Sequence, residues 1–336
     1  MPVPYWQKVL ERLDRSGSPA TAENVQFLVD RKVPSLSTLW QRVAGTLVAR
    51  GILSSGAQLG FTESGRAYSN TARERGMLVR FFYDEFYSEA EKSPAHSEFC
   101  RQVYGLDFCQ HGTADMEQLA LLVAMLRNQG AWRIVDLGCG NGMISEYLGD
   151  TLGASVLGVD FSPPTIARAN ARVRDKGGRV RFVVGDIGDA WSGARAQDAN
   201  TSDAAALGAG AFDAAVAVDS LYFVADLPQA ICSIKRLIEP AGRLYAFWHF
   251  LPRPDGTREA PEDTTLAKAL EANRLVYNAL DLTAQNRAHW LLKKQVLLRL
   301  KDRFASEGNM FLYNNRMDEC EGTLHEWSRY LYVAHA

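Results

Sequence analysis

The sequence predicts an α/β protein built on a doubly wound sheet, and three observations carry this prediction. From about residue 115, short apolar runs alternate with helical segments, a pattern typical of parallel strands with helices on both faces. A glycine-rich turn follows the first of these apolar runs, at 138–142. Acidic residues stand at the ends of four runs, where open α/β sheets bind their ligands.

The apolar runs and the segments between them predict the elements in order. Strands are expected at 133–137, 155–159, 180–184, 212–218 and 242–248. Helices are expected at 143–152, 164–176 and 227–237. A helical block over 266–304 then precedes two closing strands, at 309–313 and 328–333. The sheet should therefore have seven strands, with a helical insertion before the last two. Loops are expected at 189–211 and 252–264.

The composition is that of an ordinary globular protein. The 336 residues are 47% hydrophobic and 23% charged, with a formal net charge of −2. No apolar run of about 18 residues occurs, and the first residues carry charges where a signal peptide would be apolar. We therefore expect a cytoplasmic protein with no membrane partner. The five cysteines form no CxxC pair, so we expect neither a metal site nor a disulfide framework.

The strongest motif is VDLGCGNG at 135–142. Its glycines allow a sharp turn and a close approach of backbone to ligand, and the helix that follows offers free N–H groups to an anion. The spacing is GxGxG and not the GxGxxG of dinucleotide enzymes. Asp136, two residues before Gly138, would face a positively charged ligand group, which a nicotinamide pyrophosphate does not offer.

Three further carboxylates end the next three strands. Asp160 can accept hydrogen bonds from both hydroxyls of a ribose. Asp186 could accept from an adenine amino group while Ile187 covers the ring, and Asp219 would point into the same crevice. Any one of these residues alone would be explained as a helix cap or loop charge, but the set in register predicts a binding site.

Residues 105–250 resemble the class I S-adenosylmethionine-dependent methyltransferases, which have a Rossmann-like fold. The resemblance implies S-adenosylmethionine as cofactor and S-adenosylhomocysteine as product. The segment LIEPAGRLYAF at 237–247 is similar to the family's L-x-P-G-G approach to the fifth strand, with Ala241 in place of Gly. The implied cofactor-binding residues are Gln110, Asp136, Gly138, Cys139, Gly140, Asn141, Gly142, Asp160, Phe161, Ser162, Asp186, Ile187 and Asp219.

Two other segments extend this resemblance. Residues 103–115 are similar to the lid of phosphoethanolamine and sarcosine-type methyltransferases, which contacts cofactor and acceptor, and Gln110 and His111 take its polar positions. A loop packed on the edge of the sheet is the alternative interpretation. The helices expected at 265–306 resemble the cover that small-molecule methyltransferases place over their acceptor.

Methyl transfer is an in-line displacement, so the enzyme mainly holds the reacting atoms in line. An oxygen acceptor also needs a base, whereas an amine need only arrive neutral. The candidate bases are His249, just past the fifth strand, and His111. Tyr222 could orient an acceptor, and for all three residues simple packing is the alternative. The H-D-W base of plant and polyketide-type O-methyltransferases has no counterpart at 219–226.

Residues 1–95 have a mainly helical pattern that changes at Pro94. A helix at 35–51, two short strands within 52–62 and the run FTESGRAY at 61–68 resemble a winged-helix module. The expected recognition helix offers only Arg42 and Arg50 to DNA, whereas sequence-specific readers need several phosphate contacts. We therefore expect domains at 1–95 and 96–336, a homodimer through the first, and no nucleic-acid partner.

The preferred hypothesis is a methyltransferase that acts on an oxygen or nitrogen of a small molecule in specialised metabolism. The alternative is a winged-helix DNA-binding regulator whose second domain senses S-adenosylmethionine. A nucleic-acid methyltransferase is disfavoured, because the fourth strand leads into Asp-Ser-Leu-Tyr at 219–222 and not into an Asn-Pro-Pro-Tyr-like tetrapeptide.

Overall fold

The computed structural model of the chain divides into two compact units. It describes residues 20–21, 58–59, 63, 83, 86–188, 208–224, 226–250, 257–321 and 327–335. The first unit comprises Met1, Cys100–Leu292 and His325–Ala336, and the second comprises Pro2–Phe99 and Lys293–Leu324. The predicted domains, 1–95 and 96–336, stay a prediction.

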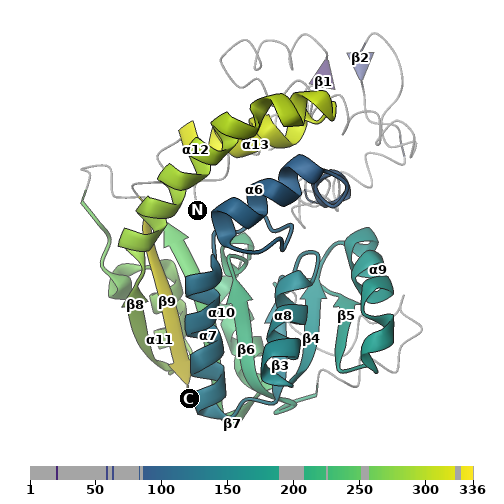
Figure 1. Cartoon of the computed structure of the whole chain (residues 1–336). Coiled ribbons are helices and arrows are strands. Elements are labelled where there is room, and N and C mark those ends of the chain that lie inside the picture. Colours follow the sequence, from purple (N-terminus) through teal and green to yellow (C-terminus); the bar gives the residue numbers. More distant parts are fainter. Residues whose placement is uncertain are drawn as a thin grey trace. The chain divides into compact units, whose positions relative to one another are not determined.

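A seven-stranded sheet organises the first unit (Figure 1). Its strands are β3 (Arg133–Leu137), β4 (Ser155–Asp160), β5 (Val180–Val184), β6 (Phe212–Val218), β7 (Ile238–Phe250), β8 (Val276–Asp281) and β9 (Ser328–His335). Their order is β5-β4-β3-β6-β7-β9-β8, with β3 to β7 parallel and β9 antiparallel to both of its neighbours. This confirms the predicted Rossmann-like sheet. The order reverses at β3, so the ends of β3, β4 and β6 form the expected ligand edge.

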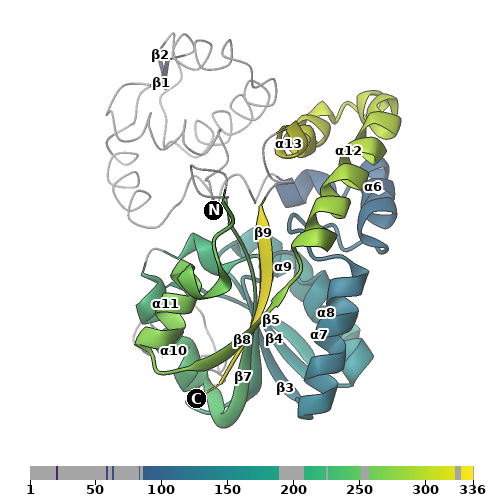
Figure 2. The same ribbon diagram turned by 90° about the vertical axis from the view of Figure 1, so that its left-hand side faces the viewer.

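Helices cover both faces of this sheet (Figure 2). On one face lie α7 (Met116–Gln129), α8 (Met143–Leu152) and α9 (Pro163–Arg172), which is followed by the 3-10 turn η1 (Arg174–Lys176). On the other face lie α10 (Leu227–Leu237) and α11 (Thr265–Ala272). Two short 3-10 turns, η3 (Leu221–Phe223) and η4 (Pro261–Asp263), connect elements on that side.

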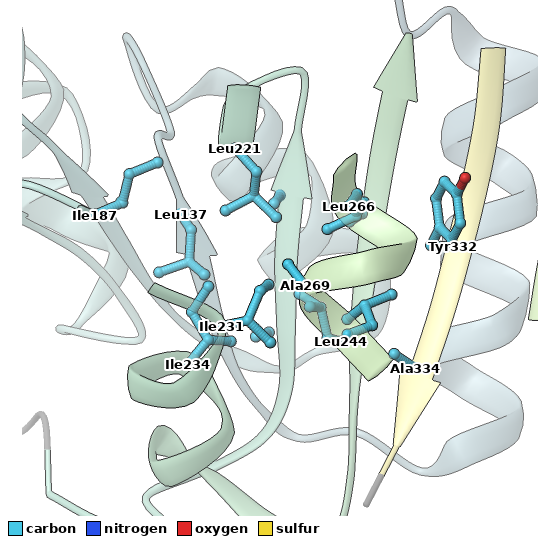
Figure 3. Close-up of a cluster of buried hydrophobic side chains, with 14 of the residues drawn as sticks. Leu137, Ile187, Leu221, Ile231, Ile234, Leu244, Leu266, Ala269, Tyr332 and Ala334 are labelled. Atoms are coloured by element: carbon cyan, nitrogen blue, oxygen red, sulfur yellow. The ribbon is translucent and has the colours of Figure 1, made fainter. Parts of the chain in front are cut away.

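The core beneath α10 and α11 explains why those helices dock. Figure 3 shows Ile231 and Ile234 of α10 and Leu266 of α11 directed at the sheet, where they meet Leu137 and Leu244. These side chains are at most 2% exposed. Burial of each contributes about 1.5–3 kcal/mol relative to an exposed position, so the apolar stripe of α10 is enough to fix it on the strands.

The predicted arrangement of the last elements is wrong in two places. The expected helical block is interrupted, because α11 ends at Ala272 and β8 follows before α12 (Thr283–Ser306). Residues 309–313 were expected to be a strand but begin the helix α13 (Met310–Glu321). The helical insertion therefore lies between the last two strands and not before them. Short apolar runs fit either a helix or a strand by periodicity, and pairing with β9 decides for a strand at β8.

Several expectations fall on residues that the structure does not describe. The helix at 35–51 lies outside the described residues, as do Ile52 and Leu53 of the expected wing. Leu59 is in a strand, β2 (Gln58–Leu59), which pairs antiparallel with β1 (Ala20–Thr21). The winged-helix module stays a prediction. The helix α6 (Pro94–Tyr104) leads into the first unit. Among the helices described, none combines the length and apolar character that a membrane crossing needs.

Candidate active site

The glycine-rich loop after β3 is packed too tightly for any other residue at two positions. Gly138 and Gly142 have φ of +74° and +78°, a region that side chains disfavour. A Cβ on Gly138 would lie 2.5 Å from the Cβ of Ser220, and one on Gly142 would collide with the Phe182 ring. The N–H groups of Gly138 and Cys139 both donate to the carbonyl of Val159, which turns the loop back over β4.

Asp160 at the end of β4 fixes this loop to the next turn. Its Oδ2 accepts from the N–H of Gly140 at 2.9 Å, and its Oδ1 accepts from the N–H of Ser162 at 3.0 Å. Ser162 is the N-cap of α9, where its side chain accepts from the N–H of Thr165. Phe161 between them is half-buried. One carboxylate thus joins the glycine-rich loop to the start of α9.

Asp136 lies buried on β3 beside these groups. The Ser145 hydroxyl donates to its Oδ2 at 2.6 Å. Burial raises the pKa of Asp136 to about 6, and the nearby Asp160 charge adds to that rise, while the Ser145 bond opposes it. Because the two carboxylates repel each other, a cation bound beside them would be stabilised. This environment fits the positively charged ligand group expected from the sequence.

The remaining residues of the glycine-rich loop are tied to neighbouring elements. Cys139 is buried, and burial first, then the Asp160 and Asp136 charges, raises the pKa of its thiol well above the usual value. Asn141 is also buried, and its Nδ2 donates to the carbonyl of Phe108 at 3.0 Å. The guanidinium of Arg172 donates to the backbone carbonyl of Asn141. The loop is therefore held from both sides.

Asp186 and Ile187 follow β5, as expected. Asp186 is half-buried and accepts from the N–H of Gly188 at 2.9 Å. Ile187 is buried in the core beneath α10, and its Cδ1 lies 3.8 Å from where a Cβ on Gly138 would be. An apolar side chain thus borders the glycine-rich loop at the position where the sequence predicts a cover for an adenine ring.

Asp219 is bonded to protein groups that the sequence did not indicate. It has φ of +56°, unusual for a residue with a side chain. The guanidinium of Arg329, on β9, donates to Oδ1 at 2.6 Å and to Oδ2 at 3.2 Å. Thr113 donates to Oδ2 through its N–H at 2.7 Å. Burial alone would raise the pKa of Asp219, but the charge and hydrogen bonds of Arg329, together with the Thr113 N–H, outweigh burial and lower the pKa to about 2.

His249 is the third member of this buried cluster. Its Nε2 lies 3.0 Å from Thr113 Oγ1 and 3.2 Å from Arg329 Nη1, and its Nδ1 lies 3.7 Å from Asp219 Oδ1. A guanidinium can only donate, so Nε2 is the accepting nitrogen and the proton of the neutral ring sits on Nδ1. The nitrogen of His249 that could act as the expected base is therefore already a hydrogen-bond acceptor from Arg329.

The other two expected catalytic residues have different surroundings. Tyr222, in η3, is half-buried, with its ring centroid 5.8 Å from that of Trp248 and 6.2 Å from that of His249. These ring contacts favour a packing role for Tyr222 over a catalytic one, although its ring lies close to His249. His111 is half-buried in the chain segment that precedes α7. Neighbouring Gln110 is buried, and its Nε2 donates to the carbonyl of Ala114 at 2.6 Å, within the same segment.

Residues 105–115, here called the strap, lie against the ends of two central strands. Phe108 is bonded to Asn141 after β3, and Thr113 is bonded to Asp219 after β6. A Cβ on Gly112 would lie 2.8 Å from Asp219 Oδ2, so the strap backbone touches the carboxylate. The strands β3 and β6 are neighbours in the middle of the sheet, and these contacts are not with its edge.

Sequence reasoning missed Arg329 and Thr113. Arg329 is fully buried, and its Nε donates to Gln118 Oε1 at 2.7 Å. One signal was available, since Arg329 directly precedes the apolar and aromatic run 330–334 of a predicted strand, and a buried charge needs a partner. Among the residues described, no group of three or more His, Cys, Asp and Glu side chains is placed to hold a metal ion.

The sequence of this chain is similar to sequences of known methyltransferases. The family model described as "Methyltransferase domain" matches residues 135–246. The ubiquinone biosynthesis O-methyltransferase of Xanthomonas axonopodis pv. citri is 30% identical over 128 residues, 38% of this chain and 47% of that protein. The demethylmenaquinone methyltransferase of Thermus thermophilus is 31% identical over 146 residues, 43% of this chain and 58% of that protein. The chain thus spans about half the length of the curated relatives it matches.

Solved structures share the fold at low identity. A putative sarcosine dimethylglycine methyltransferase from Galdieria sulphuraria has a TM-score of 0.51 at 14% identity, covering 66% of this chain and 84% of that one. Phosphoethanolamine N-methyltransferase 2 of Haemonchus contortus, solved with phosphomonomethylethanolamine and S-adenosylhomocysteine, has a TM-score of 0.50 at 17% identity. It covers 75% of this chain and 59% of that one.

Proposed function

Residues 135–246 form a methyltransferase domain of the class I, S-adenosylmethionine-dependent family, and from this premise we propose that the whole chain is an enzyme that methylates a small molecule at oxygen or nitrogen. Relatives named for O-methylation and for demethylmenaquinone methylation support a small-molecule acceptor. The dimer through residues 1–95, the cytoplasmic location and the place in specialised metabolism stay predictions.

The observation that carries the proposal is the double attachment of Asp160. Its carboxylate holds the N–H of Gly140 in the glycine-rich loop and the N–H of Ser162 at the start of α9. A carboxylate can accept several hydrogen bonds at once, and this one stands where nucleotide-binding sheets bind ribose hydroxyls. We assign Asp160 to the ribose, and Asp186 with Ile187 to the adenine.

The charges around the loop fit S-adenosylmethionine. When bound, that molecule supplies a methyl group on a positively charged sulfur. Asp136 is buried next to Asp160, and the repulsion between the two carboxylates contributes to the raised pKa of Asp136. A positive ligand group would favour the ionised form of Asp136, because an opposite charge nearby lowers the pKa of a carboxyl group. The site is therefore built to attract a cation.

This chain's contribution to the reaction is mainly to position the acceptor. In-line displacement gains several kcal/mol from holding the reacting atoms at near-attack distance. An amine acceptor needs no more than this, apart from arriving unprotonated. An oxygen acceptor needs a base, and His249 could serve only if Nε2 exchanged its bond with Arg329. His111, on the strap, is the second candidate.

Calorimetry with a matched pair of variants tests the proposal. The wild type should bind S-adenosylmethionine and S-adenosylhomocysteine. Asp160→Ala should bind each about 100-fold more weakly, because the two hydrogen bonds proposed between the ribose hydroxyls and the charged carboxylate are lost. Asp175→Ala, an exposed carboxylate on η1, is the control and should bind as the wild type does. Turnover is then sought by mass spectrometry, as gain of one methyl group on a catechol, a quinol and phosphoethanolamine.

Absence of heat with both cofactor forms in the folded wild-type protein would overturn the proposed function. Unchanged affinity in Asp160→Ala would overturn the ribose assignment while leaving the methyltransferase domain in place.

A further inference from the structure

The strap is fastened at two points across the carboxyl ends of β3 and β6. At the first point, Asn141 of the glycine-rich loop donates to the carbonyl of Phe108 at 3.0 Å. At the second, Asp219 Oδ2 accepts from the N–H of Thr113 at 2.7 Å and lies 3.2 Å from the Thr113 hydroxyl oxygen. The segment between these points crosses the carboxyl ends of β3 and β6, where the cofactor is proposed to bind.

The second attachment depends on a buried charge pair. The side chains of Asp219 and Arg329 are 1% and 0% exposed, and the guanidinium grips the carboxylate with both terminal nitrogens. Gln118, near the start of α7, accepts from the Nε of Arg329 at 2.7 Å. Since α7 follows the strap directly, Arg329 also holds the end of the strap in place.

The backbone of Asp219 is strained in a way that serves this contact. A residue with a side chain is disfavoured in the left-handed region, and such strain persists where the surroundings enforce it. With φ of +56°, Asp219 directs its carboxylate to Gly112 and Thr113. Gly112 adds the room, because a Cβ there would meet Asp219 Oδ2 at 2.8 Å.

His249 completes the attachment from β7. It is the register partner of Arg329 across the antiparallel β7–β9 pair. Its Nε2 is within hydrogen-bond distance of both Thr113 Oγ1 and Arg329 Nη1. The histidine therefore joins the strap to β9.

We propose that Arg329 is a positioning residue that, through Asp219, holds the strap closed over the glycine-rich loop and so sets how fast the cofactor leaves. This inference rests on the proposed function, because the ligand retained is the same cofactor. Arg329 touches neither the glycine-rich loop nor the expected ribose and adenine residues through any of its described bonds. Its effect on binding is therefore transmitted through the strap.

The test measures release of S-adenosylhomocysteine by stopped-flow fluorescence from the full chain. Thr113→Val keeps the charge pair and the backbone bond but removes the hydroxyl, and it should release the ligand about threefold to tenfold faster. Arg329→Met should release it fastest, and Arg329→Lys should fall between Arg329→Met and the wild type. A lysine restores the charge but not the two-pronged grip.

A matched control lies at the other end of the same strand. Asp213, in β6, pairs with Arg133 and also accepts from the N–H of Trp132 at 2.8 Å. Asp213→Asn removes a carboxylate charge from the start of β6, and Asp219→Asn removes one just past its end. Asp213→Asn should lower stability yet leave the release rate within about twofold of the wild type, which Asp219→Asn should not.

Hydrogen exchange of residues 105–115 tests the attachment without any ligand. Exchange of the Thr113 amide should accelerate in Asp219→Asn and Arg329→Met and should not change in Asp213→Asn. The inference would be overturned if folded Thr113→Val and Arg329→Lys released S-adenosylhomocysteine at the wild-type rate. It would also be overturned if Asp213→Asn accelerated release as much as Asp219→Asn does. If the wild type binds no S-adenosylhomocysteine, the proposed function fails, and unchanged Thr113 exchange would then separately refute the attachment.

Discussion

Arg329 on β9 and His249 on β7 face each other as register partners, with Arg329 Nη1 3.2 Å from His249 Nε2. Because a guanidinium only donates, this contact determines which ring nitrogen carries the proton. The contact also shows that His249, although it lies at the carboxyl ends of the strands, is hydrogen-bonded to other protein groups.

The tautomer of His249 is directly measurable. Nitrogen NMR of the ¹⁵N-labelled imidazole should show, for the neutral ring, a proton on Nδ1 and none on Nε2. Arg329→Met removes the donor and should let the two tautomers mix, because Thr113 Oγ1 can both donate to and accept from Nε2. A neutral ring in the wild type with its proton on Nε2 would contradict the assigned bond.

Binding of S-adenosylmethionine should depend on pH through Asp136. Its pKa is about 6 without ligand, and a bound cation lowers that value. Affinity should therefore fall as pH drops through 6, by about tenfold between pH 7 and pH 5, where only about a tenth of the group is ionised. Asp136→Asn should bind weakly at both pH values. Calorimetry at several pH values measures this, and an equally steep loss in Asp136→Asn would assign it to another group.

Stability at low pH should depend on Asp219. The group's pKa is lowered from 3.8 to about 2 in the folded protein, so its contribution is fully present above about pH 4. As pH falls from about 4 to about 2, roughly 2 kcal/mol is lost when the carboxylate is protonated. Urea unfolding between pH 5 and pH 2 measures this slope. Asp219→Asn should lack this part of the slope and be less stable at neutral pH, because it leaves Arg329 buried without its anion. An unchanged slope in that variant would place the titration elsewhere.

Alanine at Gly138 should cost more than alanine at Gly177. Both glycines have left-handed φ, +74° and +64°, so each substitution costs about 1–2 kcal/mol of backbone strain. At Gly177 a Cβ meets nothing within 4 Å, whereas at Gly138 it would lie 2.5 Å from Ser220. Thermal unfolding should therefore show a larger loss for Gly138→Ala, accompanied by weaker S-adenosylhomocysteine binding. Equal losses in the two variants would mean that the loop relaxes around the new methyl group.

The sequence by itself determined the central sheet and the position of the glycine-rich loop. The strands β3 to β6 start and end within one residue of their predicted bounds. Three of them, β3, β4 and β6, are buried over most of their length, and such strands are largely apolar. The glycine-rich loop and Asp160 follow from local spacing, since the loop directly follows β3 and Asp160 is the last residue of β4.

Only the tertiary structure decided the closing elements and the cluster around Asp219. Residues 276–281 and 309–313 have compositions compatible with either helix or strand, and for 276–281 antiparallel pairing with β9 selected the strand. The partner of Asp219 lies 110 residues away, on a strand that runs antiparallel to its neighbours. No local pattern encodes such a pairing, because it arises from the alignment of β9 with β7 and from the need to neutralise a charge that folding buries.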